Sequence, residues 1–120
     1  MKELFDAELA LEQAGGNEVL ARDLLQMLLN DLAAERATIA AAFRQAREEG
    51  ADITPLWDAV HKLYGATAYL GVPGLRKAAK AFEDDIKQDR RERFAQRFEQ
   101  LDAEIEKLQE AGPELLRRAW

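Results

Sequence analysis

The residues that interrupt secondary structure are few in this chain of 120 residues, and their positions constrain its fold more than any other feature. Six of the 7 glycines and all 3 prolines gather at a few points along the chain, namely Gly15 and Gly16, Gly50 with Thr54 and Pro55, residues 71–74, and Gly112 with Pro113. A polar break near Gln88 and Asp89 adds one more. The long stretches between these points are rich in Ala, Leu, Glu, Gln, Arg and Lys, which favour helix. No run of β-branched residues or Asn-Gly turn indicates a sheet. The sequence therefore predicts an all-α fold.

Each stretch between breaks carries apolar residues at helical spacing. We expect five helices: a short one over about residues 4–13, a long one from an N-cap at Asn17 to about residue 49, a third with Thr54 as N-cap and Pro55 at its first position, a fourth that opens at Pro73, and a fifth from about residue 90 to the break at Gly112. Narrow apolar stripes and short connections favour an antiparallel four-helix bundle with an additional short N-terminal helix. The length predicts a single domain over residues 1–120.

Composition excludes several kinds of chemistry. With 0 Cys and 1 His, the chain has no disulfide, no thiol nucleophile and no zinc site built from Cys or several His. It also has no serine nucleophile and no glycine-rich phosphate loop. A formal net charge of -6 disfavours nucleic acid and anionic membranes as partners. No apolar stretch approaches the roughly 20 residues of a membrane span, and the start of the chain lacks a signal-peptide core. We therefore expect a cytoplasmic domain without metal, cofactor, nucleic acid or direct membrane contact. The charged run at residues 89–93 is expected on a solvated face.

The single histidine, His61, falls about 100° around the third helix from the apolar row, so its side chain should be partly exposed. Gly65 lies one turn further on and is the only glycine expected inside a helix, where it costs about 1 kcal/mol relative to Ala. One explanation is a close helix crossing at Gly65. The other is that Gly65 and Ala68 clear a pocket beside the imidazole for a reactive group of another protein.

A metal held by His61, Asp58 and Glu83 would be a weak site. What remains for an exposed imidazole is to act itself as a nucleophile and form a covalent intermediate. An imidazole nitrogen can accept a phosphoryl group, and a bundle without an ATP site would have to receive that group from a partner protein.

The residues around His61 match a known family. The segment His61-Lys62-Leu63-Tyr64-Gly65-Ala66, followed by Gly71, resembles the signature of histidine-containing phosphotransfer (HPt) domains, in which the His is followed by Leu two residues on, Gly four on and a second Gly ten on. The spacing of Asp6, Leu11, Gly15-Gly16, Leu20 and Leu24-Leu25 also resembles the start of such domains. Residues 69–73 are similar to the C-terminal HPt module of tripartite hybrid sensor kinases. The resemblance covers nearly the whole chain.

The resemblance implies that His61 takes a phosphoryl group from an aspartate of a receiver domain and passes it to an aspartate of a response regulator. It further implies that Glu83 accepts a hydrogen bond from the ring and fixes its tautomer, and that Gly65 gives access. Tyr64 departs from the family pattern, which often has Lys at this position. Another cation would then neutralise the phosphoryl group, and the candidates are Lys62, Arg76, Lys77 and Lys80.

Several roles stay open at this point. Tyr64 either offers its hydroxyl to a phosphoryl oxygen or packs as a docking aromatic, and Trp57 is either a rim contact or a core anchor. Partner docking is expected around Trp57, Ala68 and Tyr69. Surplus apolar residues on the long helices mark either a dimer face or the seat of the N-terminal helix. The alternative function is a non-catalytic interaction module that binds receiver domains or helices, in which His61 is incidental or is blocked by Tyr64.

Overall fold

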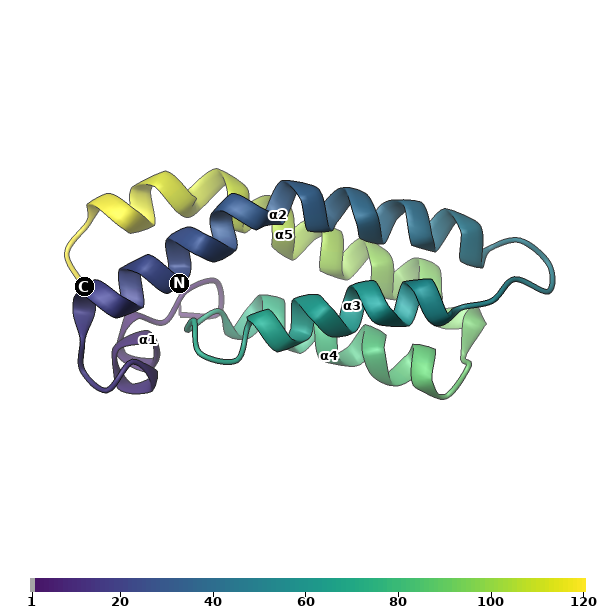
Figure 1. Cartoon of the computed structure of the whole chain (residues 1–120), viewed down its shortest axis with the longest axis horizontal. Helices are drawn as coiled ribbons and strands as arrows, with labels where there is room; N and C mark the ends of the chain where they lie inside the picture. Colours follow the sequence, from purple (N-terminus) through teal and green to yellow (C-terminus); the bar gives the residue numbers. More distant parts are fainter. Residues whose placement is uncertain (1) are drawn as a thin grey trace.

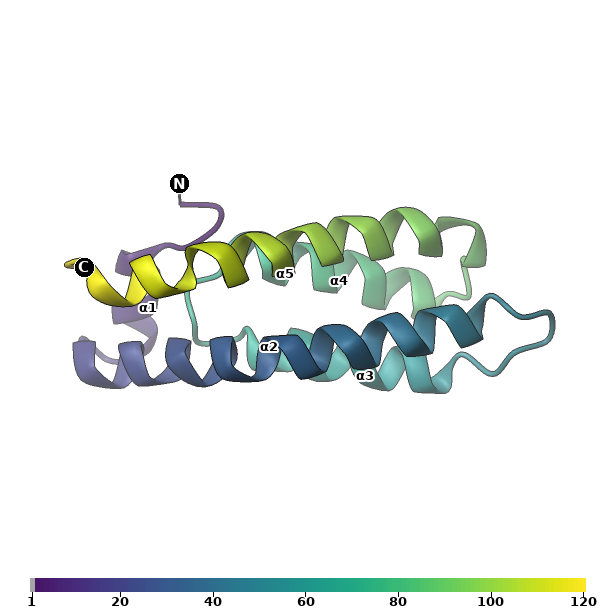
Figure 2. The same ribbon diagram turned by 90° about the horizontal axis from the view of Figure 1, so that it is seen from above.

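The computed structural model describes residues 2–120, and its regular elements are all helical. The elements are α1 (Ala7–Gln13), α2 (Glu18–Ala46), α3 (Thr54–Ala66), α4 (Pro73–Lys87), the 3-10 helix η1 (Arg91–Arg93) and α5 (Phe94–Arg117). Figures 1 and 2 show α2 to α5 running antiparallel along the long axis, with α1 beside the two termini at one end. This confirms the predicted four-helix bundle with a short N-terminal helix. No helix in the described part of the chain is long and apolar enough to cross a membrane.

The core consists of the apolar row of each long helix. In α3 the row is Leu56, Val60 and Leu63, all fully buried, as the spacing predicts. The other helices contribute equally narrow rows, including Leu25 and Leu32, Leu75 and Phe82, and Leu101, Ile105 and Leu108. Because each fully buried apolar side chain contributes about 1.5–3 kcal/mol, these rows hold the bundle together. They also leave the outer flanks of α3 free for polar side chains.

Side chains of Asp and Asn begin three of the helices. Asn17 caps α2 as predicted, since its Oδ1 accepts a hydrogen bond from the Leu20 amide at 3.0 Å. Asp6 caps α1 in the same way, so α1 begins at Ala7 rather than near residue 4. The predicted N-cap at Thr54 is wrong by one residue. Ile53 occupies that position, and Asp52 accepts from the Thr54 amide at 3.0 Å.

The predicted end of the last helix at Gly112 is wrong, because α5 continues through Pro113 to Arg117. A proline costs the helix one hydrogen bond, but Leu115 beyond it is buried, which favours continuing the helix. Gly112 faces α2, where a Cβ would lie 2.9 Å from both δ-carbons of Leu29. Gly112 thus makes room for a side chain of α2, and Gly65 is not the only glycine inside a helix.

A buried aspartate joins α4 to α5 at the end of the bundle away from the termini. The Asp85 side chain is 2% exposed and accepts hydrogen bonds from Arg97 at 2.7 Å and from Arg90 at 3.1 Å. Arg93 lies 3.6 Å from the same carboxylate. Part of the run at residues 89–93, expected on a solvated face, is thus anchored to a buried charge. The side chains of Arg90 and Arg93 are still 39% and 48% exposed, so the solvated face is confirmed for them, but the prediction missed their pairing with Asp85.

Candidate functional site

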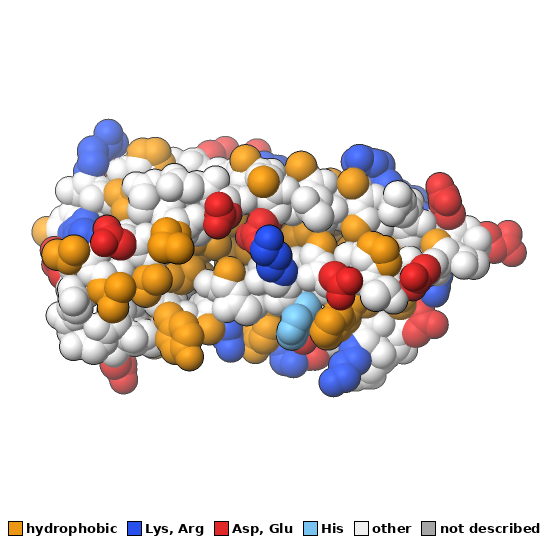
Figure 3. All heavy atoms as spheres, in the orientation of Figure 1, with side chains coloured by type: hydrophobic (Ala, Val, Ile, Leu, Met, Phe, Trp, Pro, Cys, Tyr) orange, Lys and Arg blue, Asp and Glu red, His pale blue; other side chains and the backbone are white. Residues whose placement is uncertain are grey.

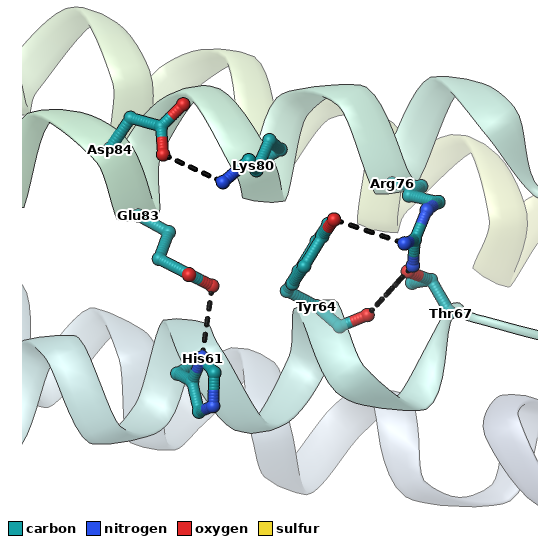
Figure 4. A network of polar contacts seen from close by, with 7 residues as sticks. All are labelled: His61, Tyr64, Thr67, Arg76, Lys80, Glu83 and Asp84. Carbon is teal, nitrogen blue, oxygen red and sulfur yellow. Dashed lines mark hydrogen bonds and ion pairs between the residues drawn. The ribbon is translucent and has the colours of Figure 1, made fainter.

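The His61 side chain lies on the outer flank of α3 and is 51% exposed. Figure 3 shows this histidine, in pale blue, at the surface beside hydrophobic side chains. Its Nδ1 lies 3.1 Å from Oε2 of Glu83, a side chain of α4 that is 10% exposed. Figure 4 shows the two side chains pointing toward one another from α3 and α4. Because a carboxylate can only accept a hydrogen bond, Nδ1 carries the proton. The lone pair of the imidazole is therefore on Nε2.

Trp57 lies one helical turn before His61 and stacks on its ring. The two ring centroids are 4.4 Å apart and the planes differ by 11°. Trp57 is half-buried and also packs against the hydrophobic core. The structure thus supports the core-anchor alternative for Trp57, whose indole also covers one face of the imidazole.

Gly65 faces open space. A Cβ built at this position meets no atom within 4 Å, so no neighbouring backbone requires a glycine here and the helix-crossing explanation is wrong. Ala66 is exposed and Ala68 is half-buried. Small residues therefore leave the surface next to His61 unobstructed, which agrees with a role in access.

We expect Gly65→Ala to stabilise the isolated domain by up to about 1 kcal/mol, because Ala is the better helix former and nothing fills the space that its methyl group enters. Urea unfolding followed by circular dichroism measures this change. Gly74→Ala, at a glycine of α4, is the matched control and should destabilise the domain, since its methyl group would lie 2.7 Å from the backbone carbonyl oxygen of Glu3. A loss of stability in Gly65→Ala would show that a contact does require the glycine.

Tyr64 points toward α4 and is held there by Arg76. The guanidinium lies 4.3 Å from the ring centroid, and its Nη2 donates to the Tyr64 hydroxyl at 3.0 Å. Arg76 Nη1 donates to Thr67 at 3.2 Å, and Thr67 in turn donates to the Tyr64 carbonyl at 2.6 Å. Figure 4 shows the phenol between Lys80 and Arg76, away from the imidazole. Tyr64 therefore does not block His61.

The candidate cations lie on different sides of the site. Lys80 is half-exposed beside Glu83 on α4, and its hydrogen bond to Asp84 at 2.9 Å raises the pKa of its ammonium. Lys62 is exposed on the flank of α3 that faces α2. Lys77 lines a different groove, between α4 and α5. The structure therefore brings Lys62 and Lys80 to the two flanks of the helix face that carries His61, while Arg76 is engaged with Tyr64. Within residues 2–120, no three His, Cys, Asp or Glu side chains are grouped to hold a metal ion.

Except for Tyr69, the exposed apolar residues near His61 were not singled out from the sequence. The large hydrophobic side chains that are exposed in the described residues are Val19, Leu20, Met27 and Tyr69. A cleft of about 240 Å³ between α2 and α3 is lined by Leu24, Met27, Leu28, Asp31, Glu35, Lys62, Ala66 and Leu70. The signal was available, because Leu20, Leu24 and Met27 continue at helical spacing into Asp31 and Glu35. We call these α2 residues, with Tyr69, the docking face.

Three comparisons with known proteins indicate the same family. The model of the Hpt domain family matches residues 23–111. The sensor histidine kinase GacS of Pseudomonas protegens is 41% identical over 106 residues, which are 88% of this chain and 11% of that protein. The signal transduction histidine-protein kinase BarA of Escherichia coli K12 is 37% identical over 87 residues, 72% of this chain and 9% of that protein. The chain thus spans only about a tenth of these curated relatives. The crystal structure of the HPT domain from a sensor hybrid histidine kinase of Shewanella superposes with a TM-score of 0.85 at 26% identity and covers 97% of this chain and 96% of that one.

Proposed function

Because the chain belongs to the Hpt domain family, whose members are phosphohistidine carriers in two-component phosphorelays, we propose that His61 accepts a phosphoryl group from a receiver-domain aspartate and passes it to a response-regulator aspartate. One observation carries this proposal. The chain has a single histidine, and its imidazole is half-exposed with Nδ1 bonded to a buried carboxylate. The absence of cysteine agrees with the cytoplasmic location that we also propose.

The arrangement suits a nucleophile that needs no base. The lone pair on Nε2 attacks phosphorus, the bond between phosphorus and the aspartyl oxygen breaks, and the aspartate leaves as a carboxylate. The proton stays on Nδ1, where Glu83 accepts its hydrogen bond and compensates the positive charge that the ring gains. Transfer to the second aspartate reverses these steps and returns the lone pair to Nε2.

The phosphoryl group brings negative charge to an exposed site, and we assign its compensation to Lys62 and Lys80. Both side chains are exposed, and their flexible stems allow the ammonium groups to move. Lys80 would exchange its bond to Asp84 for one to the phosphoryl group. Arg76 supports the site indirectly, because it holds Tyr64 away from the imidazole.

The side chains of the docking face indicate which side chains a receiver would need in order to bind there. A receiver that brings its aspartate to His61 covers Tyr69 and the α2–α3 cleft, where Met27 is 61% exposed and Tyr69 is 65% exposed. Apolar side chains that become buried on binding form the centre of protein interfaces. Asp31 and Glu35 border the cleft. We therefore expect the receiver to present an apolar side chain with a basic residue beside it.

Met27→Asp is expected to raise the KM for a phosphorylated receiver by about tenfold while leaving kcat unchanged, because it places a charge in the apolar part of the docking face. Rapid-quench measurement of phosphoryl transfer at several receiver concentrations separates the two constants. Ala103→Asp adds the same charge on an exposed position of α5 and should have no effect. An unchanged KM in Met27→Asp would place the receiver elsewhere.

The direct test of the proposed function is transfer of a radioactive phosphoryl group from a phosphorylated receiver to this domain. We expect an acid-labile, alkali-stable label on the peptide that contains His61. A domain that binds the receiver but stays unlabelled would instead be the non-catalytic interaction module.

A further inference from the structure

The indole of Trp57 covers one face of the ring that we propose as the phosphoryl acceptor. Its ring lies nearly parallel to the imidazole, with 11° between the planes and 4.4 Å between the centroids. Trp57 is half-buried and packs against the core, so its own orientation is fixed by the bundle. The imidazole thus stacks on an indole of fixed orientation, although the His61 side chain is 51% exposed.

An exposed imidazole needs such a support to be a well-aimed nucleophile. Rotation about the bond from Cβ to the ring is broad in histidine, and a half-exposed ring has few neighbours to restrict it. The hydrogen bond from Nδ1 to Glu83 fixes the tautomer and one atom of the ring. It still allows the ring plane to tilt about that contact. Stacking on Trp57 removes this remaining freedom.

On the basis of the proposed function, we infer that Trp57 is a positioning residue, which fixes the plane of His61 and thereby the direction of its Nε2 lone pair. Phosphoryl transfer depends mainly on alignment of the attacking atom with phosphorus. The ring also gains positive charge when Nε2 is phosphorylated and Nδ1 keeps its proton. A tryptophan face attracts such a charge more strongly than phenylalanine and far more than an aliphatic side chain.

This role differs from docking and from core packing in what it predicts. A docking contact changes the KM for a receiver, and a core contact changes stability. A positioning residue changes the rate of transfer from every donor, including one too small to touch the docking face. Phosphoramidate is such a donor. Nε2 attacks its phosphorus, the bond between phosphorus and the donor nitrogen breaks, and ammonia leaves.

The experiment compares the wild-type domain with Trp57→Phe and Trp57→Leu, using phosphoramidate and a phosphorylated receiver as donors. Trp57→Leu should be labelled roughly tenfold more slowly by phosphoramidate and show an equal loss of kcat with the receiver, at an unchanged KM. Trp57→Phe, which keeps a flat ring, should recover most of the rate. Ala103→Asp, on an exposed position of α5, is the control that should change the rate with neither donor, whereas Tyr69→Ala in the docking face should raise the KM for the receiver. Circular dichroism establishes that each variant is folded.

A spectroscopic measurement tests the contact in a protein that keeps Trp57. The chain has 2 Trp, and Trp120 lies against Phe5 and Arg22, apart from the site. In a Trp120→Phe background, the fluorescence of Trp57 should change when His61 is protonated or phosphorylated, because a charged imidazole quenches a stacked indole. The change should vanish when His61→Gln is added.

Two results would overturn the inference. One is a folded Trp57→Leu variant that phosphoramidate labels at the wild-type rate, and the other is Trp57 fluorescence that ignores the state of His61. Failure of the proposed function looks different, because the wild-type domain would then be labelled by neither donor.

Discussion

His61→Gln is expected to reduce phosphoryl transfer from a phosphorylated receiver by more than about 1,000-fold, to the background of the assay. The amide nitrogen of glutamine has no available lone pair, and the chain contains no second histidine to replace the first. Glutamine keeps a polar amide beside Glu83, although its nitrogen is one bond further from the backbone than Nδ1. Because the His61 side chain is 51% exposed but also stacks on Trp57 and is bonded to Glu83, the substitution should cost about 1 kcal/mol of stability and leave the domain folded.

Receiver binding provides the control for this variant. Calorimetric titration should give the same affinity for wild type and His61→Gln, so that a loss of label reports on chemistry and not on docking. Label at the wild-type level in His61→Gln would move the acceptor to another residue and end the proposal. Loss of binding together with label would show that His61 also holds the interface.

Asp85→Asn is expected to destabilise the domain by about 3 kcal/mol, the largest loss that we expect from one side chain outside the apolar core. Burial opposes ionisation of this carboxylate, but hydrogen bonds from Arg97 and Arg90 outweigh it, so the pKa of Asp85 is lowered. Removing its charge leaves three arginines around an uncharged, buried group. Urea unfolding at neutral pH measures the difference.

The lowered pKa of Asp85 determines how the effect of Asp85→Asn on stability depends on pH. A carboxylate with a lowered pKa contributes stability that is fully present above its unfolded pKa, about 4. The contribution is lost as pH falls through the lower pKa of the folded state. The gap between wild type and Asp85→Asn should therefore be constant near neutral pH and shrink in acid. Asp89→Asn is the matched control, since Asp89 pairs with Arg91 at the surface and asparagine accepts its φ of 55. A similarly large loss there would contradict the role of burial.

The helices themselves follow from the sequence because their cause is local. The spacing of Leu56, Val60 and Leu63 is enough to place the buried face of α3, and Asn17 caps α2 through an amide only three residues away. Thr54 was misleading because the helix begins one residue earlier than expected, and Asp52 accepts the amide hydrogen of Thr54 itself. Where several polar side chains lie near the start of a helix, the sequence does not show which of them caps it.

The glycines show that contacts between helices cannot be predicted from local sequence patterns. Gly65 drew attention to the region of His61 because it was taken as the only glycine within a helix, yet Gly112 is also in one. Which glycine a neighbouring helix approaches depends on how two helices cross, and that is decided by packing between residues far apart in the chain. Leu29 meets Gly112 in this way, whereas Gly65 meets nothing.

The site was predicted in part. The resemblance placed Glu83 opposite His61, and the structure brings the two to 3.1 Å. Helical spacing made Trp57 a neighbour of His61, but whether two rings stack depends on their rotamers, which no pattern in the sequence specifies. Arg76 was considered as a free cation and proves to be held by Tyr64. Asp85 was missed, although a carboxylate between Phe82 and Ile86 on an apolar face predicts a buried partner.

The anchoring of Nδ1 by Glu83 has a consequence for the order of events in a relay. It leaves one reactive nitrogen on one side of α3, so a donor and an acceptor cannot engage the domain at the same time. Under the proposed function, we therefore expect transfer to follow a ping-pong scheme, in which each receiver leaves before the next arrives. An excess of unphosphorylated receiver competes with the phosphorylated one, and flux through the domain is highest when each complex is short-lived.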